Sequence, residues 1–256
     1  MLSYSRSFGS SIRSSTTMKP AALLLASSAP CALALVYNEW SFDQVPAAGL
    51  DDIIFPFNVA TAPHKTGFYF AQQFSFKNLP DVGYTGVQPR EDKGGAPILH
   101  FVFSTFQAGS TTTDSKRCKP GADGGPGVSC AIEIPADYRP DYYFKVANVG
   151  GATWRGSVIS AGGREMTIGE WTLPKKGGKI QGSQVGFVEY YPWNSVSSHD
   201  CRHLPMTEAT FGHPLSSTAG ARGGRTRKPF EKRDCVGKVG FSVKEVKDGW
   251  KVKVGF

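Results

Sequence analysis

The segment of residues 67–77 constrains the fold of this chain more than any other. Its apolar residues alternate with small or polar ones, as they do in a strand with one buried face. The alternation is carried by four phenylalanines, Phe68, Phe70, Phe74 and Phe76. Only Gln72 interrupts that face. Each phenylalanine contributes about 2 kcal/mol when it is fully covered, so this strand requires a second layer of structure against it.

Short apolar or alternating segments recur along the rest of the chain, with glycine and proline between them. The further predicted strands are residues 36–45, 83–88, 98–107, 128–134, 142–149, 153–160, 165–173 and 184–191, and residues 50–60 are an apolar segment broken by Pro56. No stretch shows sustained helical periodicity, and residues 108–127 and 195–234 are predicted as long loops. This spacing predicts an all-β fold, an antiparallel β-sandwich or jelly roll.

The chain ends in a predicted β-hairpin. Its arms, residues 239–243 and 250–254, alternate apolar and polar residues around Lys247-Asp248-Gly249. Asp-Gly between alternating arms is a strong hairpin signal, because both turn residues need positive φ. No internal repeat or linker divides the chain, so we predict a single domain, residues 35–256, with the hairpin within residues 235–256.

The first 34 residues have the pattern of a secretory signal peptide. They contain no acidic residue, and an apolar run at 21–29 is followed by Ala32-Leu33-Ala34. We expect cleavage before Leu35 and a secreted, extracellular protein, with translation starting at Met1 or Met18. The Arg- and Ser-rich residues 1–17 leave a transit peptide as the alternative. The apolar run is too short for a transmembrane helix, so no membrane span is predicted.

Four cysteines remain after such cleavage, namely Cys118, Cys130, Cys201 and Cys235. An even number in an exported chain predicts two disulfides, and four cysteines allow three pairings. Sequential pairing would close two glycine-rich loops. In a reducing compartment the same four residues would be unpaired thiols, and the sequence does not choose among these arrangements.

Several segments together resemble a known family. They are Gly67-Phe68-Tyr69-Phe70 with Gln72-Gln73, Tyr84-Thr85-Gly86-Val87-Gln88, residues 99–106, Glu170-Trp171-Thr172-Leu173, Gly186-Phe187-Val188-Glu189, Arg202 and Phe211-Gly212. In this order they resemble the family called domain of unknown function 3472, over roughly residues 37–214. The resemblance implies a secreted β-sandwich, which in bacteria often stands beside carbohydrate-binding modules. It implies no established reaction and therefore no catalytic residues.

One carboxylate, Glu189, lies within an aromatic run at residues 187–193. A glycan-cleaving site needs a second carboxyl group, and we predict Glu165 or Glu170 as that partner, on a neighbouring strand. These two residues point to opposite faces, so only one of them can reach Glu189. The aromatic residues that could stack on sugar rings are Trp171, Tyr190, Tyr191 and Trp193. The alternative is that the aromatic residues are core and the glutamates are solvated.

The segment His199-Asp200-Cys201-Arg202-His203 has two histidines four residues apart. Zinc-protease sites need a glutamate after the first histidine and a helix beneath both. Here the second residue is Asp200 and no helical pattern surrounds it. We therefore predict no metal and no cofactor, and expect a disulfide at Cys201 with solvated histidines.

Basic residues gather between residues 222 and 233 in a chain whose net charge is +8. Arg222, Arg225, Arg227 and Lys228 are candidates for binding an anionic polymer, although a solvated, flexible loop is the simpler interpretation. In an exported chain we do not expect nucleic acid as a partner. Oligomeric state is not encoded in any pattern we find.

These observations favour a secreted β-sandwich that engages carbohydrate, an extracellular or cell-wall polysaccharide, through an aromatic-lined face. One alternative is a glycan-cleaving hydrolase or lyase that uses Glu189 with Glu165 or Glu170. Another is an exported interaction or effector protein that acts through its basic loop. Whether the protein is an enzyme is left open by the sequence.

Overall fold

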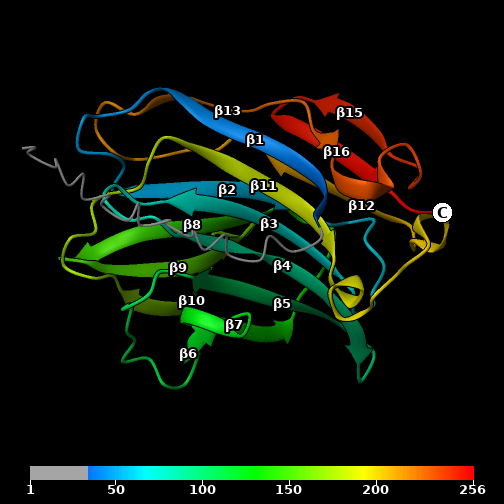
Figure 1. Ribbon diagram of the computed structural model, residues 1–256, viewed down its shortest axis with the longest axis horizontal. Coiled ribbons are helices and arrows are strands. Elements are labelled where there is room, and N and C mark those ends of the chain that lie inside the picture. The colour runs from blue at the N-terminus through cyan, green and yellow to red at the C-terminus, as the bar shows by residue number, and fades with distance from the viewer. Residues whose placement is uncertain (1–33) are drawn as a thin grey trace, which may run out of the picture.

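Two antiparallel β-sheets lie face to face in the computed structural model, which describes residues 34–256 (Figure 1). The predicted all-β, antiparallel sandwich is thereby confirmed, including the C-terminal hairpin. Each predicted strand is present in one of the two sheets. The predicted signal peptide lies outside the described residues except for Ala34, which begins the first strand.

The larger sheet has nine strands, in the order β13-β1-β11-β3-β4-β5-β7-β6, with β14 also paired to β1. Its strands are β1 (Ala34–Gln44), β3 (Phe68–Ser75), β4 (Val82–Lys93), β5 (Ala96–Thr105), β6 (Cys118–Ala122), β7 (Gly125–Pro135), β11 (Ser183–Tyr190), β13 (Arg222–Thr226) and β14 (Phe230–Glu231). In Figure 1, β1, β11, β3, β4 and β5 follow one another across the sheet.

The smaller sheet has seven strands, in the order β10-β9-β8-β2-β12-β16-β15. They are β2 (Asp52–Asn58), β8 (Tyr142–Gly150), β9 (Thr153–Ser160), β10 (Glu165–Thr172), β12 (Thr207–Gly212), β15 (Ser242–Val246) and β16 (Gly249–Val254). Three short 3₁₀ helices complete the described residues, η1 (Tyr191–Ser195), η2 (Cys201–His203) and η3 (Arg233–Cys235). No helix in this part of the chain is long and apolar enough to cross a membrane.

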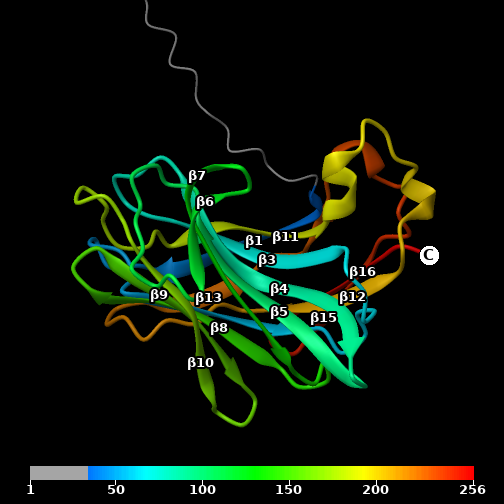
Figure 2. The same cartoon turned by 90° about the horizontal axis from the view of Figure 1, so that it is seen from below.

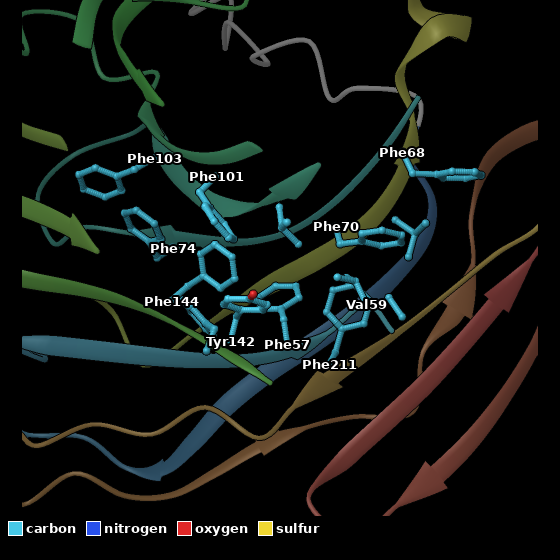
Figure 3. Packing of buried hydrophobic residues seen from close by; sticks show 14 of the residues in the cluster. Phe57, Val59, Phe68, Phe70, Phe74, Phe101, Phe103, Tyr142, Phe144 and Phe211 are labelled. Carbon is cyan, nitrogen blue, oxygen red and sulfur yellow. The ribbon is translucent and has the colours of Figure 1, made fainter. Parts of the chain in front are cut away.

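Aromatic rings from both sheets fill the space between them (Figure 3). Phe101 of the larger sheet packs against Phe144 of the smaller sheet, with ring centroids 5.7 Å apart, and Phe144 in turn packs against Phe57 at 5.0 Å. The four phenylalanines that alternate along β3 and the residue after it, Phe76, are all buried in this layer, as predicted. Gln72, which interrupts them, is also buried, and its side-chain amide donates a hydrogen bond of 3.0 Å to Asn38.

A β-bulge in β10 changes which residues face the core. Thr167 pairs with Ser157 and Gly169 with Gly156, so Ile168 is an extra residue between them. The bulge lets Ile168 and Trp171 both turn inward, and both are fully buried. Trp171 stacks on Phe103 at 4.6 Å. The prediction that Trp171 contacts a ligand is therefore wrong.

The paired glycines Gly156 and Gly169 form a flat surface on the inner face of the smaller sheet. A Cβ on Gly156 would lie 2.2 Å from the ring of Phe103. A Cβ on Gly169 would lie 2.5 Å from the sulfur of Cys118. Because neither glycine carries a side chain, a ring and a disulfide from the opposite sheet rest directly on this backbone.

Two of the predicted loops contain strands. Within residues 195–234, β12 pairs with β2 and β16 and lies inside the smaller sheet. Its alternation covers only six residues, with Thr207, Ala209 and Phe211 buried, which is too short to dominate a polar segment. Within residues 108–127, β6 pairs with β7, with bulges that disturb its alternation.

The C-terminal hairpin is present, but its turn differs from the predicted one. Val246 pairs with Gly249, so Lys247 and Asp248 are the loop residues, and neither has positive φ. Gly249 belongs to β16, where a Cβ would lie 2.1 Å from the carbonyl oxygen of Phe211. Glycine is therefore required at this position because two strands approach each other closely there, and not because of the turn.

Substitution of Gly156 tests the contact between the sheets. We expect Gly156→Ala to lower the free energy of unfolding by about 1–3 kcal/mol, because the added methyl group displaces Phe103 from its stack on Trp171. Gly162→Ala is the matched control, since no atom lies within 4 Å of its Cβ position, and it should change stability by less than about 0.5 kcal/mol. Urea denaturation measures both, and equal effects would contradict this packing.

Candidate functional site

Glu189 lies on the outer face of the larger sheet, the face turned away from the smaller sheet. Its neighbour Val188 belongs to the core between the sheets, and successive side chains of a strand point to opposite faces. Glu189 pairs with Ala34 of β1 on one side and with Tyr69 of β3 on the other. These three residues therefore share the outer face.

A second apolar cluster surrounds this carboxyl group on the outer face. It includes Tyr69, Tyr84 and Phe187, all buried. The ring of Tyr69 meets the ring of Phe187 at 5.5 Å and that of Tyr84 at 5.3 Å, both edge to face. Glu189 itself is 4% exposed. A carboxyl group so placed has lost most of its contact with water.

Burial raises the pKa of Glu189 to about 7. The side-chain amide of Asn194 opposes this effect, because it donates a hydrogen bond of 2.6 Å to Oε1 and favours the ionised form. The carboxylate of Asp123 adds to the rise through like-charge repulsion. Glu189 can therefore hold or release a proton near neutral pH, which is what an acid–base group requires.

Asp123 reaches the outer face from the β6–β7 hairpin. Ala122 pairs with Gly125, and the two loop residues Asp123 and Gly124 have φ of 48° and 78°. Positive φ at both positions is the arrangement of a type I′ turn. The disulfide Cys118–Cys130 joins the two strands of this hairpin.

Two tyrosines of the outer cluster, Tyr69 and Tyr84, have hydroxyl groups that feel the charges of both Asp123 and Glu189. Tyr84 donates to Asp123 at 3.1 Å, whereas the hydroxyl of Tyr69 is buried without a hydrogen-bond partner. Burial raises the pKa of both tyrosines well above the usual range, so both stay protonated and can donate. An unsatisfied buried donor is costly in a folded protein and is often retained for function.

The helix η1 brings Asn194 to the same place. Tyr191, at its start, accepts hydrogen bonds from the backbone N–H of Gly67 at 3.0 Å and from Arg90 at 3.3 Å. The next residue, Pro192, fixes φ at the first turn. In Figure 2, η1 and the β6–β7 hairpin both rise from the same side of the larger sheet. A hollow of about 540 Å³ adjoins the hairpin and is lined by Asp123, Lys119 and Ser129 among others.

Glu165 and Glu170 do not join this site. Both belong to β10, which lies in the smaller sheet, whereas β11 lies in the larger one. Glu165 pairs with Lys145 at 3.8 Å and Glu170 with Arg155 at 2.6 Å, both within the smaller sheet. The prediction that either residue is the second carboxyl group beside Glu189 is wrong, because consecutive strands β10 and β11 are in different sheets.

The predicted sugar-stacking residues are mostly covered. Trp193 is buried and stacks on His199 at 4.1 Å. Tyr190 is half-buried between Phe68 and Trp193. Of the four, Tyr191 lies beside the candidate site. It is half-buried, and its hydroxyl accepts hydrogen bonds from Gly67 and Arg90. These aromatic residues do not form an exposed face.

The basic segment is partly ordered as the edge strand β13, which pairs with β1. Arg225 pairs with Asp43 at 2.9 Å and Arg227 with Glu39 at 3.4 Å. The backbone N–H of Arg227 also donates to the carbonyl oxygen of Glu39. The expectation of a flexible loop is wrong for β13, while Arg222 and Lys228 are exposed and their role in binding an anion stays a prediction.

The four cysteines form two disulfides in sequential order, Cys118–Cys130 and Cys201–Cys235. The predicted disulfide at Cys201 is confirmed. Of the two histidines beside it, His203 is exposed, with 83% of its side chain accessible. His199 differs from the expectation, because only 10% of its side chain is accessible.

Some of the site residues that the sequence analysis did not name have recognisable sequence patterns. Asp123-Gly124 is the same Asp-Gly hairpin signal that was applied at Asp248-Gly249. Tyr69 and Tyr84 lie on the polar face of predicted strands. Asn194 had no signal, because its contact with Glu189 depends on the turn of η1.

Known proteins give no assignment for this chain. No protein-family model matches, and no curated protein matches. Among solved structures, Scytalido-glutamic peptidase with a peptide-based transition-state analogue has 9% identity and a TM-score of 0.43, covering 87% of this chain and 98% of that one. SCP-B, a member of the Eqolisin family of peptidases in complex with the tripeptide Ala-Ile-His, has 8% identity and a TM-score of 0.40, with the same coverage. Likeness at this level assigns neither family nor activity.

The raised pKa of Glu189 has a consequence for stability. Folded Glu189 holds its proton up to about pH 7, whereas an exposed glutamate releases it near 4.5. The folded state therefore binds more protons in that window, and stability is lost as pH rises through it. The variant Glu189→Gln cannot ionise. Relative to wild type, its free energy of unfolding should gain roughly 3 kcal/mol between pH 4 and pH 8.

Urea denaturation across that pH range measures this difference. The exposed Glu245→Gln serves as the control, and its difference from wild type should not change with pH. A flat difference for Glu189→Gln would mean that the Glu189 carboxyl group has the same pKa in the folded and unfolded states, and would contradict a raised pKa.

Proposed function

We propose that the protein is an exported hydrolase in which Glu189 accepts and donates the proton, and that its substrate is a polypeptide. The observation that carries this proposal is the contact between the buried Glu189 carboxyl group and the Asn194 amide at 2.6 Å. A buried carboxyl group with a raised pKa that accepts a hydrogen bond from a neighbouring side chain is a candidate acid–base group.

Hydrolysis of an amide bond needs two things from a protein. A base removes a proton from water as the water adds to the carbonyl carbon, and a donor stabilises the negative charge on the carbonyl oxygen. Ionised Glu189 supplies the base, and after protonation it can supply the acid for the leaving amine. The candidate donors are the amide of Asn194, which contacts Glu189, and the buried hydroxyl of Tyr69.

A glycosidic bond is the less favoured substrate. Its cleavage normally uses two carboxyl groups that flank the bond. Glu165 and Glu170 lie in the other sheet, and Asp123 is already held by the hydroxyl of Tyr84. The group that touches Glu189 directly is a carboxamide rather than a second carboxyl. Carbohydrate binding, which the sequence favours, also lacks its exposed tryptophans, because Trp171 and Trp193 are buried.

Export is supported by the two disulfides, since such bonds persist in oxidising compartments. The predicted signal cleavage also bears on access to the site. Ala34 pairs with Glu189 and is buried in the same outer cluster. Cleavage before Leu35 would remove this neighbour and open the carboxyl group to a substrate.

The activity test uses the chain starting at Leu35, with the full chain beside it. It is incubated between pH 3 and pH 8 with a denatured protein and with a panel of plant and fungal polysaccharides. We expect new amino termini from the protein substrate, formed faster by the shorter chain. Glu189→Gln should lower kcat/KM at least about 100-fold, whereas Glu170→Gln, which changes a glutamate of the other sheet, should leave it within about twofold.

The variant Asn194→Ala tests whether Asn194 acts on the ionisation of Glu189 or only supports the fold. Because the amide favours ionised Glu189, its removal should shift the ionisation seen in the pH profile of kcat/KM upward. If only the polysaccharides are cleaved, the substrate is a glycan and not a polypeptide. Cleavage of neither substrate, or equal rates for Glu189→Gln and wild type, would refute the hydrolase.

A further inference from the structure

We infer that the Cys201–Cys235 pair, once reduced, forms a binding site for a divalent zinc-type cation together with His199 and Asp234. The disulfide joins η2 to η3 across 34 residues of sequence, His199 lies beside its two sulfurs, and the carboxylate of Asp234 contacts His199. The disulfide and the metal site are alternative states of one pair of sulfurs. This inference is independent of the hydrolase proposal.

The donor atoms already have suitable spacing. Nε2 of His199 and the sulfurs of Cys201 and Cys235 all lie within 4.8 Å of one another. Nε2 is 3.5 Å from the sulfur of Cys235 and 3.2 Å from Oδ2 of Asp234. A tetrahedral zinc site with ordinary bond lengths places its donors about 3.3–3.8 Å apart. The two bonded sulfurs have to separate for zinc to bind between them, and reduction permits that.

The imidazole of His199 is held in an orientation that suits metal binding. Its ring stacks on Trp193 with an interplanar angle of 13° and a centroid distance of 4.1 Å. That stacking leaves 10% of the side chain accessible and directs Nε2 toward the sulfur of Cys235. An oriented imidazole beside two cysteines is a donor set that zinc prefers.

The other polar residues of this segment are engaged elsewhere. Asp200 accepts hydrogen bonds from the backbone N–H and the guanidinium of Arg202. His203 is exposed, and its Nδ1 lies 3.6 Å from Asp200. The site therefore uses His199 and Cys201 of this segment and takes Asp234 and Cys235 from η3.

The second disulfide provides an internal comparison. Cys118–Cys130 lies against Gly169, and the sulfur of Cys118 contacts the carbonyl oxygen of Glu170. Within residues 34–256, His199, Cys201 and Cys235 are the one group of three or more donor side chains close enough to hold a metal ion. Reduction of Cys118–Cys130 yields two thiols without a neighbouring imidazole, so it should not create a comparable site.

The conversion is chemically balanced. A trialkylphosphine reduces the disulfide by two electrons and becomes the phosphine oxide, taking its oxygen atom from water. The two hydrogen atoms of that water complete the two thiols. Zinc then binds the thiolates, and both thiol protons are released to solvent.

The full chain is reduced with the phosphine, freed of reductant without oxygen, and titrated with zinc against a chromophoric chelator. We expect one zinc ion per reduced chain and none per oxidised chain. Cys118→Ser with Cys130→Ser should keep the binding, and Cys201→Ser with Cys235→Ser should abolish it. His199→Ala should weaken it at least about tenfold. Cobalt in place of zinc should give a thiolate charge-transfer band in the same samples.

A measurement on the unaltered protein keeps the test independent of folding in the variants. Zinc should slow alkylation of Cys201 and Cys235 in the reduced chain, and leave Cys118 and Cys130 unchanged, as read by mass spectrometry. If zinc leaves the alkylation of Cys201 and Cys235 as unchanged as that of Cys118 and Cys130, the inference is overturned. Equal zinc binding by the two double variants, or unchanged binding by His199→Ala, would overturn it as well.

Discussion

The fold depends on the contact of the two sheets across the paired glycines Gly156 and Gly169. Their bare backbone receives the ring of Phe103 and the disulfide Cys118–Cys130 from the opposite sheet. Phe103 then stacks on Trp171 at 4.6 Å, so a large aromatic residue of each sheet fills the space beside the glycines. Because interiors are packed at crystal-like density, a single added methyl group at this contact would have to move one of these groups.

This contact also positions the outer face. The disulfide that lies on Gly169 joins β6 and β7, and the tip of that hairpin carries Asp123 to the hydroxyl of Tyr84. Inner residues of β3 and β11 fill the core, while the alternate residues Tyr69, Phe187 and Glu189 build the outer cluster. The same strands thus serve both stability and chemistry. Burial in that second, smaller cluster raises the pKa of Glu189 to about 7.

Strand positions were predictable because the alternation of apolar residues is local. Phe68, Phe70 and Phe74 indicate a buried face from their spacing alone, and the structure buries them. Local pattern failed where one extra residue shifts the alternation, as Ile168 does in β10. It failed again at Asp248-Gly249, where Gly249 is required by the nearby Phe211 carbonyl oxygen and not by a turn.

The alternating and interrupted apolar pattern determined by itself that the chain forms antiparallel strands in a sandwich. The four cysteines that follow the predicted signal peptide were compatible with two disulfides. Glu189 was also recognisable, as a lone carboxylate in an aromatic strand. The tertiary structure alone decided its neighbours. Strands consecutive in sequence, β10 and β11, belong to different sheets, while Asp123 and Asn194 arrive through a hairpin and a 3₁₀ turn. Which residues meet depends on the pairing of distant strands and on how sheets pack, and neither is encoded in the periodicity of a single segment.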